Sequence, residues 1–343
     1  MEYGYIAEKP ILENHAGNKA RTDIDKIFAS RYDEPLVNIV NREGVIDRLF
    51  LEGIKRFYNC RKISNAKNKT YVFQYPCYIK CYRRALEKLV KNNRTIVIIH
   101  DLDFLRSMSK ETIKDCINEL NTYTVLIVHN NKMREKLEEL GVTSAMVTLT
   151  LFDYLLEDPP KTNREKSKTV AFAGNLAKSE FLKMHEIAQL KLRINLYGPN
   201  YDSSLIKSSN ILFKGSYTPE VIPFQLEGSF GLIWDGKSID TCSGSFGEYM
   251  KYNNPQKLSL YIAAGLPIIC WNQSAISEFV KEHNIGFSVA SLNDISDYID
   301  NINFEMYQNY VDNIVKLQRK VIKGNYTSQA LKAAEHYILQ FDN

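Results

Sequence analysis

The sequence lacks an excess of charge of either sign. Its 343 residues include 44 Lys and Arg against 40 Asp and Glu, so the formal net charge is only +4 and the pI is about 8.5. Proteins that bind nucleic acid through an extended basic surface are usually more basic, so this charge argues against nucleic acid as a partner. Anionic small molecules stay possible.

Long apolar runs are also absent. The longest apolar stretch, residues 258–271, is interrupted by Gly265 and Pro267 and is shorter than the roughly 20 residues that a membrane-spanning helix needs. The first ten residues mix acidic, basic and aromatic side chains and have no basic segment followed by an apolar one, so they do not resemble a signal peptide. We expect a cytoplasmic protein without a transmembrane segment.

The cysteines do not form a recognisable framework. Only Cys77 and Cys81 lie close together in the sequence, and neither a second pair nor a cluster of histidines accompanies them. This pattern fits neither a zinc site nor a disulfide scaffold. We expect reduced thiols.

What the sequence does contain is a repeated alternation of short β-branched runs with amphipathic stretches, which is typical of parallel strands joined by crossover helices. The predicted strands of the first half are 71–74, 95–100, 124–129 and 144–151. The predicted helices between them are 17–30, 46–57, 78–91, 110–120 and 132–140. The fold class is α/β.

A polar, proline-containing stretch, 157–168, predicts a linker between two such domains. The second series of predicted strands is 169–174, 194–198, 211–214, 230–234, 267–270 and 286–290. The predicted helices are 179–190, 219–226, 255–264, 275–282, 303–322 and 328–341. We therefore expect an N-terminal domain over 1–156, a C-terminal domain over 169–322, and a last segment, 323–343, that packs back on the N-terminal domain.

The stretch 249–270 is the most informative. Asn254 suits a helix N-cap and Pro255 a first helical residue, so Lys257 falls in the first turn. A cation there opposes the helix dipole, whereas a bound anion would make the same position favourable. Two interpretations stay open: a diphosphate site, or a surface lysine on an ordinary helix.

Polar residues follow two predicted strands, where open α/β sheets bind ligands. One strand ends in Asp235 and Gly236, and a glycine-rich loop, 241–247, comes next with Gly244. Another strand runs into Gly174 and Asn175, with Lys178 just beyond.

Together these residues resemble the nucleotide-binding half of the GT-B glycosyltransferases, which contain two Rossmann-like domains facing across a cleft. The resemblance rests on the Gly-Asn sequence at the end of a predicted strand and on the segment N-P-x-K-x-x-x-Y-x-A-x-G-x-P at 254–267. The likeness is closer to one bacterial branch of these enzymes: the accessory glucosyltransferases that extend O-linked N-acetylglucosamine on serine-rich-repeat adhesins, and their galactofuranosyltransferase-like relatives. The segments that carry it are AGNKARTDID (16–25), FQYP (73–76), IHDLDFLR (99–106), VHNNKMREKLEELGV (128–142), FAGNL (172–176) and WDG (234–236) through SLYIAAGLPII (259–269).

This resemblance implies a hexosyltransferase that moves glucose from a UDP-sugar to an acceptor such as N-acetylglucosamine on a surface glycoprotein. It also implies a homo-oligomer, a dimer or tetramer, without a further cofactor. Many retaining relatives hold the ribose with glutamates at positions that are Leu260 and Tyr252 here. Their absence favours an inverting reaction.

In this framework Lys257 and the amides after Asn254 stabilise the leaving diphosphate, while Asn175, Lys178, Asp235 and Tyr249 orient the donor. Further candidate donor contacts are Tyr217, Gly236, Gly244 and Ser259. Tyr217 and Tyr249 are singled out because aromatic faces suit base stacking and both are expected in loops near strand ends.

The first half offers a second set of candidates. Asp101 and Asp103 form a DxD triplet directly after a predicted strand that ends at His100. Such a pair can bind a divalent metal, but the cations of the other domain make a metal unnecessary, so we expect none. We assign His100, Asp101 or Asp103 as general base or acceptor contact, with helix capping by an aspartate as the alternative.

The polar loop 13–19 adds His15, Gly17 and Asn18 to the candidates, because the resembled family has a loop in this region near donor and acceptor.

Three other functions compete with this assignment. A dehydrogenase is disfavoured because no G-x-G-x-x-G follows the first strand of either domain. A non-catalytic subunit of a transferase complex and a galactofuranosyl- or other hexosyltransferase of surface polysaccharide both stay open.

Overall fold

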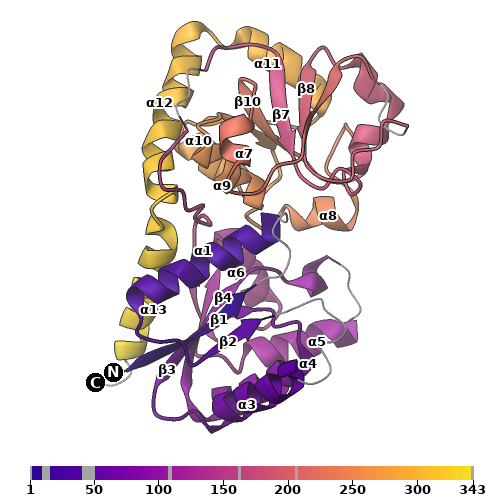
Figure 1. Cartoon of the computed structure of the whole chain (residues 1–343). Helices are drawn as coiled ribbons and strands as arrows, with labels where there is room; N and C mark the ends of the chain where they lie inside the picture. The colour runs from indigo at the N-terminus through magenta and orange to yellow at the C-terminus, as the bar shows by residue number, and fades with distance from the viewer. Residues whose placement is uncertain are drawn as a thin grey trace. The chain divides into compact units, whose positions relative to one another are not determined.

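The computed structural model describes residues 2–9, 16–40, 51–106, 110–160, 164–204 and 208–340. The chain divides into two units (Figure 1): unit 1 contains Gly17–Thr150 with the first strand and Tyr326–Asn343, and unit 2 contains Leu151–Asn325. Each unit is built on a six-stranded, wholly parallel sheet with helices. The predicted α/β class is confirmed.

In unit 1 the strand order is β2-β1-β3-β4-β5-β6. The strands are β1 (Tyr3–Lys9), β2 (Val37–Val40), β3 (Thr70–Tyr75), β4 (Arg94–Ile99), β5 (Val125–Val128) and β6 (Ala145–Thr148). The helices are α1 (Ala16–Arg31), α3 (Leu51–Asn65), α4 (Lys80–Asn92), α5 (Lys110–Leu120), α6 (Asn131–Glu139) and α13 (Asn325–Leu339), with a 3₁₀ turn η1 (Asp103–Leu105). Strands β3 to β5 are almost continuously apolar because helices cover both faces of the sheet.

Helices α1 and α13 lie on one side of this sheet and α3, α4 and α5 on the other (Figure 1). The α1–α13 contact includes an ion pair between Arg31 and Glu335, and the Tyr32 hydroxyl donates to the same carboxylate at 2.6 Å. The last long helix of the chain is therefore part of unit 1.

Unit 2 has the strand order β12-β11-β10-β7-β8-β9. The strands are β7 (Thr169–Ala173), β8 (Arg193–Tyr197), β9 (Ile211–Gly215), β10 (Phe230–Ile233), β11 (Ile268–Trp271) and β12 (Gly286–Val289). The α-helices are α7 (Ile222–Gln225), α8 (Gly244–Tyr249), α9 (Gln256–Ala263), α10 (Ser277–Glu282), α11 (Ile295–Asn301) and α12 (Phe304–Val321). The 3₁₀ helices are η2 (Glu180–Lys183), η3 (His185–Gln189) and η4 (Leu292–Asp294).

Several predicted elements differ from the structure. The helix predicted over 179–190 is wrong: two 3₁₀ helices, η2 and η3, stand there. The glycine-rich loop predicted at 241–247 is partly helical, since α8 begins at Gly244. Helix α9 begins one residue later than predicted, because Pro255 has extended backbone and is the N-cap. Strands β1 and β2 were not predicted, since β1 ends in charged residues and β2 is only four residues long.

The end of the predicted linker, residues 164–168, is held against other parts of unit 2 by three cations. Arg164 donates to the carbonyls of Leu226, Gly228 and Ala264 at 2.7 to 3.3 Å. Lys166 donates to the main-chain carbonyls of Ile299, in the last turn of α11, and of Ile302, just after it. Lys168 pairs with Asp300 at 2.6 Å. These bonds satisfy carbonyls at element ends, which otherwise need water or a cap.

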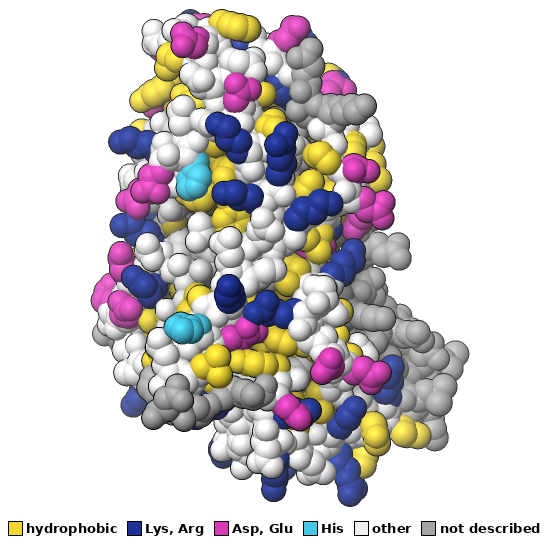
Figure 2. All heavy atoms as spheres, turned by 90° about the vertical axis from the view of Figure 1, so that its left-hand side faces the viewer, with side chains coloured by type: hydrophobic (Ala, Val, Ile, Leu, Met, Phe, Trp, Pro, Cys, Tyr) yellow, Lys and Arg dark blue, Asp and Glu magenta, His cyan; other side chains and the backbone are white. Residues whose placement is uncertain are grey.

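None of the helices in the described part of the chain is long and apolar enough to cross a membrane. On the face shown in Figure 2, basic, acidic and apolar side chains are interspersed.

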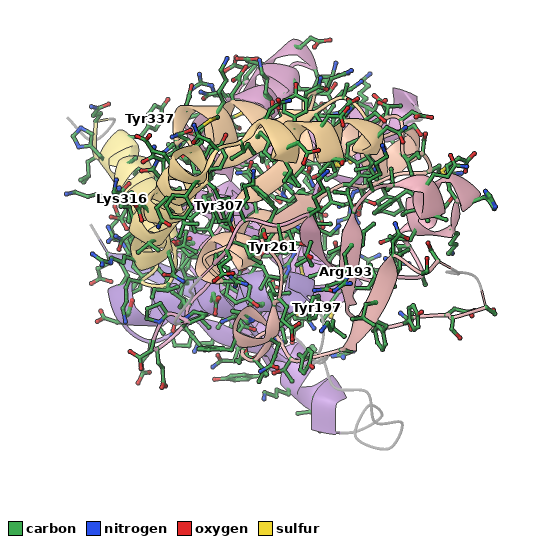
Figure 3. The ribbon with its side chains drawn as sticks, turned by 90° about the horizontal axis from the view of Figure 1, so that it is seen from above. Arg193, Tyr197, Tyr261, Tyr307, Lys316 and Tyr337 are labelled. Atoms are coloured by element: carbon green, nitrogen blue, oxygen red, sulfur yellow. The ribbon has the colours of Figure 1, made fainter. Side chains whose placement is uncertain are left out.

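The junction of β7 and β10 depends on Tyr261 of α9. The two strands pair through Phe230–Val170 and Gly231–Ala171, and beyond these pairs the Tyr261 hydroxyl accepts from the Ala173 amide at 2.8 Å and donates to the Leu232 carbonyl at 3.2 Å. The ring fits because Gly231 has no side chain: a Cβ there would lie 2.4 Å from it. Figure 3 shows Tyr261 inside unit 2, together with Tyr197 and Tyr307. Their hydroxyls also bond to the main chain: that of Tyr197 accepts from the Glu227 amide, and that of Tyr307 donates to the Ser229 carbonyl.

We predict that Tyr261→Phe lowers the free energy of unfolding by about 1 to 3 kcal/mol, because it leaves a buried amide and a buried carbonyl without their partner. Unfolding by urea measures this. Tyr298→Phe is the matched control, since Tyr298 is 49% exposed, and it should change stability by no more than about 0.5 kcal/mol. Equal effects of the two substitutions would contradict the bridging role.

Candidate functional site

In unit 2 the chain reverses its direction across the sheet between β7 and β10. From β7 it proceeds to β8 and β9 on one side, and then returns to β10, β11 and β12 on the other. In open α/β sheets such a switch point leaves a crevice at the carboxyl ends of the two strands, and ligands bind there. Here β7 ends before Gly174 and Asn175, and β10 before Asp235 and Gly236.

Lys257 lies across these strand ends. It is the second residue of α9, and its Nζ is 3.8 Å from Asp235 Oδ2 and 4.8 Å from the centroid of the Phe172 ring. Its Cε would lie 3.1 Å from a Cβ at Gly174, so glycine leaves room for the lysine chain. The Lys257 side chain is 18% exposed. A partly buried cation is thereby held between a carboxylate, an aromatic face and two strand ends.

The neighbouring polar groups are fixed by local bonds. Asn175 Oδ1 accepts from the Asn200 amide at 3.1 Å and from the Ala177 main chain at 3.2 Å. Asp235 Oδ1 accepts from the Gly236 amide at 3.1 Å. Gly236 has φ of +108°, and a Cβ there would lie 2.4 Å from the Ser243 carbonyl, so this turn requires glycine. Of the predicted donor residues, the structure brings Asp235, Gly236 and Lys257 together, and Asn175 directly follows Gly174, beside which Lys257 lies.

The other predicted donor residues lie differently. Lys178 is exposed beyond the turn, and the Tyr217 hydroxyl donates to the Lys214 carbonyl at 3.0 Å near the end of β9. Tyr249 is buried at the end of α8 and not in a loop as predicted, and Gly244 is the first residue of that helix.

Asn254 and Ser259 are both buried on or beside α9. The Ser259 hydroxyl donates to the Phe152 carbonyl at 2.7 Å and therefore ties α9 to the chain that enters unit 2.

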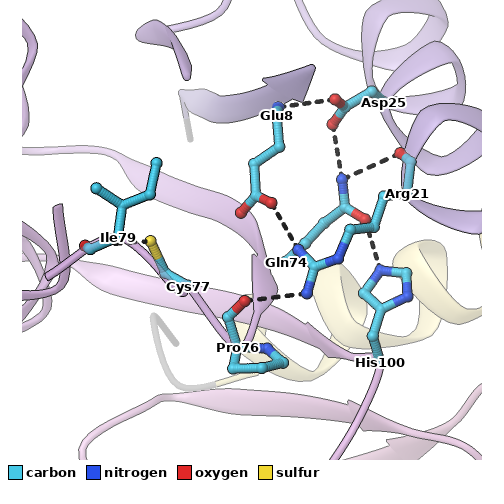
Figure 4. Close-up of polar contacts among 8 residues, drawn as sticks. All are labelled: Glu8, Arg21, Asp25, Gln74, Pro76, Cys77, Ile79 and His100. Carbon is cyan, nitrogen blue, oxygen red and sulfur yellow. Dashed lines mark hydrogen bonds and ion pairs between the residues drawn. The ribbon is translucent and has the colours of Figure 1, made fainter. Parts of the chain in front are cut away.

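Unit 1 has its own switch point, between β1 and β3, and a polar network occupies it (Figure 4). Arg21 of α1 pairs with Glu8 at the end of β1 at 2.6 Å and donates to the Pro76 carbonyl at 3.0 Å. Asp25, one helical turn further along α1, accepts from the Glu8 main-chain amide and from Gln74 Nε2, both at 2.7 Å. The network joins α1 to three strands.

The predicted His100 belongs to this network. Its Nε2 lies 2.6 Å from Gln74 Oε1, at the carboxyl end of β4. Because Gln74 Nε2 donates to Asp25 and to the Arg21 carbonyl, its oxygen is the group that faces the imidazole. Burial, with Arg21 nearby, lowers the pKa of His100 well below 6.5. His100 is therefore a neutral imidazole at pH 7, a state that can accept a proton.

Burial also shifts the carboxyl groups of the network. It raises the pKa of Asp25 to about 7, partly offset by the Glu8 amide that donates to it. It raises the pKa of Glu8 too, against the opposing effect of the Arg21 guanidinium. Acids and bases whose pKa values are displaced by burial are common at functional sites.

Asp101 and Asp103 both pair with Arg106: Asp101 with one guanidinium nitrogen, and Asp103 with the other at 3.3 Å. Asp103 begins the short helix η1, and its side chain is 64% exposed. No group of three or more described His, Cys, Asp or Glu side chains is arranged to hold a metal ion.

The predicted N-terminal loop is partly helical, because α1 begins at Ala16. Gly17 and Asn18 therefore lie in its first turn, and Lys19 is buried in an ion pair with Asp23 at 2.6 Å. His15 lies outside the described residues.

Sequence reasoning missed Arg21, Asp25, Gln74 and Tyr261 as positioning residues. A signal was present for two of them: Arg21 and Asp25 are four apart on a predicted helix and so share one face.

A cavity of about 640 Å³ also lies in unit 1, lined by residues of α4, α5 and β3. Its lining combines Phe73, Leu86 and Tyr123 with Arg83 and Glu119, which lie 3.7 Å apart. None of the predicted site residues lines this cavity.

We predict that the stability difference between the wild type and Asp25→Asn depends on pH. Folded Asp25 keeps its proton up to about pH 7, whereas the unfolded side chain loses it above its ordinary value of 3.8. As pH rises from about 4 to about 7, the free energy of unfolding of the wild type should therefore fall by roughly 2 to 4 kcal/mol relative to that of the variant. Above about pH 7 the difference should stay constant. Urea unfolding at a series of pH values measures this. A difference that does not change with pH would contradict the assignment.

Comparisons with known proteins agree with this architecture. Residues 12–151 match the family model "Glucosyltransferase 3-like, N-terminal domain" and residues 170–334 match "Glucosyltransferase 3-like, C-terminal domain". Beta-1,6-galactofuranosyltransferase WbbI of Escherichia coli K12 is 30% identical over 92% of this chain and 93% of its own. Glucosyltransferase 3 of Streptococcus gordonii is 25% identical over 69% of this chain and 70% of its own.

Two solved structures share the fold at low identity. Sucrose-phosphate synthase of Thermosynechococcus elongatus has a TM-score of 0.61 at 12% identity, with 99% of both chains covered. Anabaena HepE in complex with UDP-glucose has a TM-score of 0.59 at 11% identity, with 98% of this chain and 99% of its own covered. The predicted GT-B fold and the resemblance are thus confirmed, and the chain belongs to the glucosyltransferase 3-like family of glycosyltransferases.

Proposed function

We propose that the chain moves a hexose from a UDP-sugar to a sugar acceptor, with glucose as the first candidate sugar and N-acetylglucosamine on a surface glycoprotein as the first candidate acceptor. The observation that carries the proposal is the position of Lys257 across the carboxyl ends of β7 and β10. A diphosphate at this switch point would lie at the start of α9, where helix dipole and lysine both favour negative charge.

The proposed reaction is inverting and needs no metal. The acceptor hydroxyl attacks the anomeric carbon as a base takes its proton, and the bond to the diphosphate breaks so that UDP leaves. Lys257 would balance the charge that develops on the leaving oxygen, a task that metals perform in other transferases. Asn175 and Asp235 would orient the donor.

His100 is the base that we propose. It is neutral because burial lowers its pKa, and Gln74 fixes its orientation. Asp101 and Asp103 suit this role less, because both already pair with Arg106.

Galactofuranose is the second candidate sugar. The relative that is 30% identical over nearly the full chain is named a galactofuranosyltransferase, whereas the one named a glucosyltransferase is 25% identical over 69%. The two sugars share the diphosphate site, so the Lys257 argument holds for both.

A cytoplasmic location and a homo-oligomeric state are further parts of the proposal. All six cysteines are free thiols, as expected in a reducing compartment. The oligomer rests on the family resemblance alone.

We predict that Lys257→Ala lowers the rate of UDP release by roughly 100-fold or more, because one charged contact to the leaving group is lost. Thermal unfolding should be nearly unchanged, and Lys257→Arg should recover part of the rate. Lys281→Ala, an exposed lysine on another helix of unit 2, is the matched control. Wild-type activity in Lys257→Ala would contradict the diphosphate assignment.

The donor is identified with the same assay. UDP release is measured from UDP-glucose, UDP-galactofuranose and other UDP-sugars, with and without an N-acetylglucosaminyl peptide, and in parallel with EDTA and with Mg²⁺. Release from UDP-glucose stimulated by the peptide supports the first candidate. Release from UDP-galactofuranose alone supports the second, and no release from any donor supports a non-catalytic subunit.

We predict that His100→Ala lowers kcat by at least about 100-fold, the typical contribution of a general base. The pKa of His100 is well below 6.5. Wild-type kcat/KM should therefore stay level as pH falls to 6.5 and should drop only below pH 6.5, where His100 becomes protonated. Asp101→Asn and Asp103→Asn are the comparisons. If either reduces kcat more than His100→Ala does, the base is that aspartate.

A further inference from the structure

Helix α3 carries large apolar side chains on the side that faces solvent. Ile54, Phe57 and Tyr58 are 66%, 71% and 65% exposed, and their spacing places them on one face of the helix. The opposite face is the one that packs: Ile63 is fully buried, and Asn59 donates to the Tyr82 hydroxyl of α4 at 3.2 Å. The exposed stripe is therefore not part of the core of unit 1.

The same region concentrates the positive charge of the chain. Residues 51–94 contain twelve Lys and Arg against two Glu, a net charge of +10, whereas the rest of the chain contains 32 basic and 38 acidic residues. On α3 the exposed cations Lys55, Arg61 and Lys62 accompany the apolar stripe. On the neighbouring α4 the exposed cations are Lys80, Arg83, Arg84, Lys88 and Lys91.

This combination limits what can cover the surface. A second copy of the same surface would bring two highly positive regions together, which like-charge repulsion opposes. Nucleic acid would use the cations but would leave Ile54 and Phe57 in water. An anionic lipid surface uses both, because the apolar side chains enter the boundary between headgroups and acyl chains while the cations stay with the headgroups.

We propose that α3 and α4 form a membrane-docking surface that holds unit 1 on a bilayer containing anionic phospholipids. The stripe of Ile54, Phe57 and Tyr58 inserts at the interface, and the cations of the two helices bind the headgroups. Docking of this kind is peripheral and reversible, and it does not depend on the sugar chemistry proposed above.

The test is co-sedimentation of the full chain with vesicles of phosphatidylcholine, alone or mixed with phosphatidylglycerol, without donor or acceptor. We expect binding to the mixed vesicles only, with release by salt. Phe57→Ser should weaken binding roughly tenfold or more, because one aromatic side chain no longer inserts. Lys55→Gln combined with Lys62→Gln should weaken it about 25-fold, or about fivefold for each cation.

Matched controls come from unit 2. Phe304→Ser removes an aromatic side chain that is 79% exposed, and Lys281→Gln with Lys316→Gln removes two exposed cations. Both should bind vesicles as the wild type does, and all variants should keep the wild-type unfolding midpoint. Equal binding to pure phosphatidylcholine, no binding at all, or unchanged binding of the α3 variants would overturn the proposal. Self-association that Phe57→Ser abolishes would also overturn it and assign the surface to a second copy.

Discussion

The hydroxyl of Tyr261 determines where the candidate donor site lies. Beyond Ala171 the two strands no longer pair with each other, and the hydroxyl bonds instead to the Ala173 amide of β7 and the Leu232 carbonyl of β10. The strand ends can therefore separate without leaving these two groups unpaired. Gly231 makes this possible, since no other residue leaves room for the ring. Lys257 is one helical turn before Tyr261 on α9, so both side chains share a face. The helix whose tyrosine separates the two strand ends therefore also carries the lysine that lies across them.

The two units use the same sheet topology differently. At the switch point of unit 2 the side chains are a cation, a carboxylate and amides, with Lys257 3.8 Å from Asp235 and not in a close ion pair. At the switch point of unit 1 the polar side chains bond to one another. Arg21 pairs with Glu8, and Gln74 bonds to both Asp25 and His100. The first arrangement leaves charge available to a ligand, while the second holds an imidazole in one orientation and protonation state.

Most of the sheet framework follows from the sequence, because buried parallel strands are continuous apolar runs such as 95–99 and 125–128. Lys257 could also be predicted, since its place after Asn254 and Pro255 fixes a first helical turn. The roles of Gln74 and Tyr261 could not, because they depend on strands and helices that come together only in the fold. The net charge of the whole chain also gave no indication of the docking surface, because a value of +4 conceals the +10 of residues 51–94.

The free thiols have a practical consequence. Burial raises the pKa of Cys60 to about 11 and that of Cys77 and Cys270 to about 12, and it raises those of Cys116 and Cys242 as well. Since thiolates are the reactive species, these five react slowly with alkylating reagents. Cys81 on α4 is the exposed cysteine. A maleimide dye would therefore label the natural chain mainly at Cys81, within its most basic region, without any engineered cysteine.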